Sequence, residues 1–90
     1  MISDKEYNLQ DFEMISVEPY VYRLFKNEDI FLMEVTCGSH GLWQVWIKLN
    51  DEETLLYKNE GELGLKKTAG IFMFNCHGSE YKHRYVLVNY

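Results

Sequence analysis

Two cysteines and two of the three histidines have the chemistry of metal ligands. They occur as Cys37-x-x-His40 and as Cys76-His77, each beside a glycine-containing turn. Two thiolates and two imidazoles could form a tetrahedral zinc site, but each pair here mixes ligand types, unlike usual zinc-binding segments. The two turns also fall at opposite ends of a simple antiparallel meander, unless residues 59–70 cross over. A zinc-stabilised domain is therefore the third hypothesis, and two free, buried thiols are the expected state.

Either cysteine could also form a catalytic pair with a histidine: His40, His77 or His83. Such catalysis needs a thiolate, a base within hydrogen-bond reach and a third group that orients the base. Nothing in the sequence brings these groups together, and it contains no glycine-rich phosphate loop, nucleotide-binding fingerprint or nucleophile elbow. We therefore expect a protein that is not an enzyme and that uses no cofactor and no metal ion.

The segment Tyr81-Lys82-His83-Arg84-Tyr85 interleaves aromatic and basic side chains. On a strand, the two cations would share one face and could hold a phosphate, while the tyrosines could stack on bases. His83 could then act as a general acid or base in RNA cleavage. In the structural alternative, the tyrosines pack inward while Lys82 and Arg84 neutralise nearby acids. The net negative charge favours this alternative, so a small ribonuclease or RNA-binding module is the second hypothesis.

Two acidic clusters fall in segments expected to form turns. Glu28 and Asp29 form one cluster, and Asp51, Glu52 and Glu53 form the other. Alternate turns of a meander share one edge of the sheet, so the five carboxylates would gather there. Such a surface suits the basic cleft of a partner, because opposite charge accelerates encounter about 10–1000-fold. The common alternative is a solubilising rim that discourages aggregation.

Trp46 is a candidate anchor beside these acids. Trp43, Val45 and Ile47 occupy one face of the predicted strand. Trp46 therefore lies on the other face, beside Gln44 and Lys48. A tryptophan exposed among charges is typical of an interface anchor. An N-terminal helix lying on this face of the sheet could equally cover it.

Length, composition and charge limit the classes of protein that the chain can represent. The 90 residues are 47% apolar and 26% charged, with a net charge of −5, which fits a single folded domain spanning residues 1–90. Residues 1–62 carry thirteen acidic and five basic side chains, whereas residues 63–90 carry one acidic and four basic side chains. This balance excludes a general nucleic-acid coat and an anionic-membrane binder. No apolar run reaches the ~18 residues of a membrane span and no secretory signal is evident, so a cytoplasmic location is expected.

The periodicity of the chain predicts an α+β fold. The S-x-x-E capping box at Ser3 predicts a short helix over residues 4–12, followed by a strand near Met14–Val17. Two-residue alternation predicts a four-stranded antiparallel meander from Pro19 to Lys58. Three glycines predict a loop or a single helical turn at residues 59–70. Further strands are expected at residues 71–74 and 81–90, giving a twisted sheet of five to six strands with one short N-terminal helix.

These observations favour a non-catalytic inhibitor that docks an acidic surface into the basic site of a nucleic-acid-handling partner. Toxin-immunity proteins and phage anti-defence proteins that imitate DNA work by this physics. The expected partner is a basic protein such as a nuclease or a DNA-binding protein, whereas direct binding of nucleic acid or of a membrane is not expected. Homodimerisation through an edge strand is compatible with all three hypotheses. The residues expected to bind the partner are Glu28, Asp29, Asp51, Glu52, Glu53 and Trp46.

Overall fold

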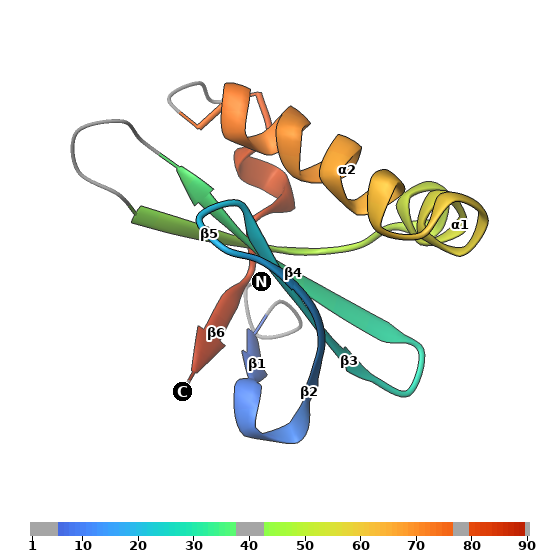
Figure 1. The fold of residues 1–90 in the computed structure, drawn as a ribbon. Coiled ribbons are helices and arrows are strands. Elements are labelled where there is room, and N and C mark those ends of the chain that lie inside the picture. Colours follow the sequence, from blue (N-terminus) through green and yellow to red (C-terminus); the bar gives the residue numbers. More distant parts are fainter. Residues whose placement is uncertain (1–5, 38–42, 77–79, 90) are drawn as a thin grey trace.

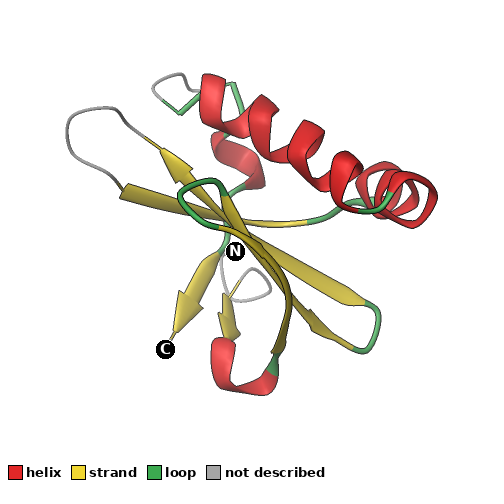
Figure 2. Ribbon diagram, viewed as in Figure 1, coloured by secondary structure: helices red, strands yellow, loops and turns green. Residues whose placement is uncertain are grey.

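The centre of the molecule is a four-stranded antiparallel sheet. The computed structural model describes residues 6–37, 43–76 and 80–89. The strands follow one another in the order β2-β3-β4-β5, as a meander. They are β2 (Glu13–Glu18), β3 (Tyr22–Asn27), β4 (Ile30–Cys37) and β5 (Trp43–Lys48). Two helices lie on one face of this sheet, and a short pair of strands lies on the other (Figures 1 and 2).

Helix α1 (Asp51–Glu60) follows β5 directly, and α2 (Glu62–Phe74) follows α1. Asn50 begins α1 with a capping box, in which its side chain accepts a hydrogen bond from the backbone N–H of Glu53 at 2.8 Å. Gly61 joins the helices with a φ of +64°, a conformation that favours glycine. At Gly64 a Cβ atom would lie 2.7 Å from the backbone oxygen of Leu56, so the helices pack closely because this residue has no side chain.

The two ends of the described chain form the layer opposite the helices. Strand β1 (Glu6–Asn8) pairs in parallel with β6 (Leu87–Asn89). Short 3-10 helices, η2 (Leu9–Asp11) and η3 (Lys82–Arg84), lie next to them in the chain. The C-terminal segment passes along the edge of β5, where Tyr85 bridges Ile47 and the N–H of Val86 donates to the carbonyl of Trp46 at 2.9 Å.

The sheet separates two apolar clusters. The larger lies between the sheet and α2, and its fully buried members include Leu24, Met33, Ile47, Leu65 and Phe72. The smaller lies on the other face, where the terminal segments cover three buried side chains: Phe25, Leu32 and Trp46.

The alternation predicted for the central strands is confirmed. Phe31, Met33 and Val35 face α2, as do Val45 and Ile47. The predicted strand near Met14–Val17 is also confirmed, as β2. The fold is α+β, and its central sheet is a four-stranded meander as expected.

The predicted N-terminal helix is wrong. Residues 6–11 form β1 and η2, and Ser3 of the expected capping box lies outside the described residues. Tyr7, Leu9 and Phe12 instead pack against the cluster around Trp46. Tertiary burial of these side chains outweighs the weak local preference for a helix.

The extent of the meander is also corrected. The meander begins earlier than predicted, with β2, and it ends with β5. Residues 54–58, which were expected to form its last strand, belong to α1. Residues 59–70 and the expected strand 71–74 form the end of α1, the joint at Gly61 and α2. The predicted long strand 81–90 is a 3-10 turn followed by the short β6, and residue 90 lies outside the described residues.

Cys37 and Cys76 form a disulfide, with Cα atoms 6.1 Å apart. The expectation of two free thiols is therefore wrong. The connection that includes residues 59–70 forms two helices after β5, and it returns the chain to the end of β4, where Cys76 meets Cys37. Within the described ranges, no helix combines the length and apolar character needed to cross a membrane.

Candidate functional site

The β3–β4 turn presents the first acidic cluster. Asn27 pairs with Ile30, which leaves Glu28 and Asp29 as a two-residue hairpin turn. Both residues are exposed. Glu28 has a φ of 54°, in the left-handed region that glycine or asparagine adopts more easily. The hairpin therefore holds a glutamate where its backbone favours a different residue.

The N-terminus of α1 presents the second cluster, and its three acids have different environments. Asp51 and Glu52 are exposed in the first turn, where negative charge interacts favourably with the helix dipole. Glu53 accepts a hydrogen bond from the backbone N–H of Asn50 at 2.9 Å and forms an ion pair with Arg84 at 2.6 Å. Its carboxylate is therefore used within the fold.

Members of the two clusters line one hollow of about 390 Å³. Glu28 and Asp29 reach it from the hairpin, and Asp51 reaches it from α1. The hydrogen bond from the Leu49 N–H to the Phe31 carbonyl, at 3.0 Å, holds the chain entering α1 against the start of β4. Three lysines also line this hollow: Lys26, Lys48 and Lys58.

Two further acids extend this surface. Asp11 and Glu13 line a neighbouring hollow of about 480 Å³ that shares Glu28 and Lys26 with the first. We call Asp11, Glu13, Glu28, Asp29 and Asp51 the acidic end. Sequence reasoning missed the first two because it placed them in or beside an N-terminal helix; as η2 and the start of β2, they lie next to the β3–β4 hairpin.

Trp46 is not an exposed anchor. Its side chain is buried, with 7% of its surface exposed, and it packs against Phe25 with ring centroids 5.5 Å apart. The alternative expectation, that another part of the chain covers Trp46, is closer to the structure. The covering element is the terminal layer of β1 and β6, however, and not a helix.

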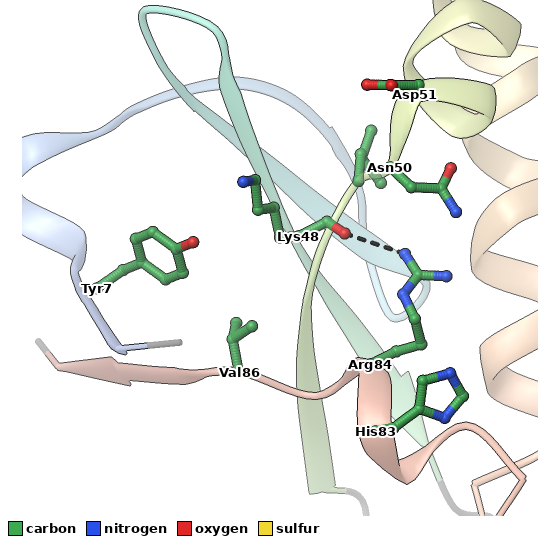
Figure 3. Close-up of a pocket in the computed structure, with 8 residues that line it drawn as sticks. Tyr7, Lys48, Asn50, Asp51, His83, Arg84 and Val86 are labelled. Carbon is green, nitrogen blue, oxygen red and sulfur yellow. Dashed lines mark hydrogen bonds between the residues drawn. The ribbon is translucent and has the colours of Figure 1, made fainter. Parts of the chain in front are cut away.

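A third hollow of about 420 Å³ lies between β5, the start of α1 and the C-terminal segment. Figure 3 shows His83 and Arg84 on one side of it and Tyr7, Lys48 and Val86 on the other. These groups could contact an anion, although Asp51 also lines the hollow.

Arg84 is already engaged within the fold. Its guanidinium donates to both carboxylate oxygens of Glu53, at 2.6 and 3.1 Å, and to the Lys48 carbonyl at 3.0 Å. It also lies 5.4 Å from the centroid of the Phe72 ring. Tyr81 and Tyr85 pack against the larger apolar cluster. Arg84, Tyr81 and Tyr85 therefore have the structural roles of the alternative interpretation, but they lie in and beside a 3-10 turn and not on the expected strand.

The metal and thiol hypotheses lose their sulfur ligands. Cys37 and Cys76 are bonded to each other, so neither is a thiolate available to zinc or to a Cys–His pair. His40 and His77, the other proposed ligands, lie outside the described residues. In the part of the chain that the structure describes, no group of three His, Cys, Asp or Glu side chains is arranged to hold a metal ion.

The disulfide also bears on the expected cytoplasmic location. Disulfides persist mainly in oxidising compartments and are uncommon in the cytosol.

Comparisons with protein-family models, with curated proteins and with solved structures find no match for this chain.

Proposed function

We propose that this protein is a non-catalytic inhibitor that docks its acidic end into the basic site of a nucleic-acid-handling protein. The observation that carries the proposal is the convergence of Glu28, Asp29 and Asp51 on one hollow, from two separate elements. A toxin-immunity protein or a phage protein that imitates DNA would use such a surface. Opposite charge would accelerate its encounter with the partner and orient it.

The conformation of Glu28 supports this role. A non-glycine residue in the left-handed region costs about 1 kcal/mol, and such strain often marks functional positions. Glu28 lines both hollows of the acidic end. A strained residue within the proposed docking surface therefore supports a role in binding.

The lysines that line the hollow give the acidic end a mixture of positive and negative charges. Three acids and three lysines line the first hollow, and Lys26 also lines the second hollow beside Asp11 and Glu13. Binding to a basic site then depends on how the two sets of charges align. The cations reject misaligned partners, because like charges brought together cost several kcal/mol.

Matched double variants test the proposal. Asp29→Asn/Asp51→Asn removes two charges from the acidic end, whereas Glu62→Gln/Glu80→Gln removes two exposed acids elsewhere. Proteins from cells that produce the chain are captured on the wild type, and the affinity of each captured protein is measured from about 50 to about 500 mM salt. We expect a basic protein whose affinity falls with salt and falls at least about tenfold in the acidic-end variant only.

Two results would contradict the proposal. One is an affinity that stays flat across the salt series. The other is an equal loss in both double variants, which would mean that net charge alone matters and that the acidic end has no special role.

The 420 Å³ hollow retains a second function, binding or cleavage of RNA. Its specific support is the placement of His83 and Lys48 around one hollow with Tyr7. Arg84→Ala would disturb the fold through Glu53, so His83→Ala and Lys48→Ala are the sharper variants. RNA cleavage or binding that survives both substitutions would eliminate this function.

We propose that the protein meets its partner in the cytoplasm. Nucleic-acid-handling enzymes act there, and the acidic charge of the chain suits a basic partner. The Cys37–Cys76 bond is the feature that tests this location, because a reducing compartment would open it.

A further inference from the structure

The outer face of α2 exposes two large apolar side chains near its two ends, with a lysine and a glycine between them. It carries Leu63, Lys67, Gly70 and Phe74, spaced by four, three and four residues, which places them on one side of the helix. The buried positions Leu65 and Phe72 lie on the opposite side. Leu63 is 58% exposed and Phe74 is 92% exposed, so this face is not covered by the described chain.

We propose that two copies of this chain dimerise by packing these outer faces against each other in antiparallel orientation. The spacing of the four residues matches the seam of a two-stranded coiled coil. A twofold axis at the middle of the helix, between residues 68 and 69, sets Leu63 of one copy beside Phe74 of the second copy. The same axis sets Lys67 beside Gly70, and it repeats both contacts.

The sizes of the side chains are complementary in this register. A Cβ atom placed at Gly70 would meet nothing within 4 Å, so the helix surface is open there. The aliphatic stem of Lys67 from the second copy fits over this opening, while its ammonium group stays at the rim. That ammonium is already 2.8 Å from Glu60 of its own chain.

The charge on this face also suits a second copy. Lys67 pairs with Glu60, and Lys66 lies 3.4 Å from Glu18, so cations and anions are balanced beside the apolar residues. Two chains that each carry −5 can meet here with little repulsion, whereas the acidic ends would repel each other. Because these cations are already paired, the face has no surplus positive charge to attract an anionic lipid surface.

Pairing of edge strands is a poorer route to a dimer. The exposed edge is β2, and two β2 strands paired about their centres would set Glu13 against Glu18 of the second copy. Like charges at that spacing disfavour the pair. The α2 face therefore replaces the edge strand as the surface for self-association.

Sedimentation equilibrium from about 1 µM to about 1 mM chain tests the proposal. Two 13-residue helices bury less than the ~800 Å² per partner of a standard interface, so we expect a dissociation constant on the order of 10–100 µM. Phe74→Ser should raise the dissociation constant at least about 30-fold, because in a twofold-symmetric dimer one substitution removes a phenylalanine contact at two places. Leu87→Ser, on β6 in the opposite layer, is the matched control and should leave it unchanged; Leu87 is 54% exposed.

A second variant separates dimerisation from folding. Gly70→Gln fills the opening at the proposed contact, yet it improves helix propensity and meets nothing within 4 Å in a single chain. We expect it to raise the thermal unfolding temperature of the monomer while raising the dissociation constant at least about tenfold. A chain that is monomeric at 1 mM, or a dimer weakened by Leu87→Ser and not by Phe74→Ser and Gly70→Gln, would overturn the proposal.

Discussion

Arg84 illustrates how one residue in a basic, aromatic segment can be structural. A phosphate ligand needs free donors, but the guanidinium of Arg84 already donates to Glu53 and to the Lys48 carbonyl. Its side chain and that of Glu53 are both mostly buried. The pair joins the C-terminal segment to the start of α1, so Glu53 stabilises the fold and is a poor candidate for a partner contact.

At the residue scale, Glu28→Gly separates stability from binding. Glycine adopts the φ of 54° without steric cost, so the free energy of unfolding should rise by about 0.5–1 kcal/mol. The same change removes a carboxylate of the acidic end and should weaken partner binding. Chemical denaturation measures the first effect, and titration of the captured partner measures the second.

Asp29→Gly is the matched control for this experiment. Asp29 lies in the same turn, but it is not among the described non-glycine residues with positive φ. Glycine there adds entropy to the unfolded chain without relieving strain, so stability should fall by a few tenths of a kcal/mol or more. Equal changes in stability for both variants would mean that the conformation of Glu28 is not strained.

At the level of elements, the sequence predicts strands better than helices, for a physical reason. Every second residue from Phe31 to Val35 and from Val45 to Ile47 packs against α2, and this two-residue period is visible in the sequence of β4 and β5. Helix α1 has no fully buried residue and therefore no strong apolar stripe. Local signals that could have identified it are the capping box at Asn50, the acids of the first turn and the glycine that follows the helix, Gly61.

The glycines of residues 61–70 predicted a loop, but two of them allow the two helices to join and to pack closely. Gly61 makes the joint between the helices, and Gly64 allows α1 and α2 to approach each other. Both functions depend on tertiary contacts that a single sequence does not show. Glycines that are required by a helix crossing look the same in sequence as glycines that are required by a loop.

Alanine substitutions at two glycines of α2 test this explanation. Gly64→Ala places a Cβ atom 2.7 Å from the Leu56 backbone oxygen, so it should lower the free energy of unfolding by about 1–3 kcal/mol. Gly70→Ala meets no neighbour and should raise it by about 0.5–1 kcal/mol through helix propensity. Denaturation at low chain concentration measures both values, and a stabilising Gly64→Ala would contradict the close crossing.

At the scale of the whole molecule, part of the acidic surface follows from strand direction alone. The end of β5 and the β3–β4 turn share one edge because β3, β4 and β5 are antiparallel. That rule is enough to place Asp51 near Glu28 and Asp29. It does not place Asp11 and Glu13, or show that Trp46 is covered, because both depend on how the chain termini fold back onto the sheet.

The Cys37–Cys76 bond is the covalent link between the sheet and the end of α2. It closes a segment with a sequence separation of 39 residues that contains β5, α1 and α2. Closing a segment of this length restricts the unfolded chain, so reduction should lower the free energy of unfolding by about 3–4 kcal/mol. Leu65 and Phe72 remain in the core without the bond, so the reduced chain should still fold.

Denaturation with and without dithiothreitol measures this contribution. The double variant Cys37→Ser/Cys76→Ser should match the reduced wild type and should not respond to the reductant. Rapid alkylation of thiols in living cells then shows which form is present. A fully alkylated chain that retains partner binding would place the protein in a reducing compartment and make the bond dispensable for docking. A chain that resists alkylation, and whose reduction lowers both stability and partner affinity, would contradict the cytoplasmic location, because only an oxidising compartment maintains such a bond.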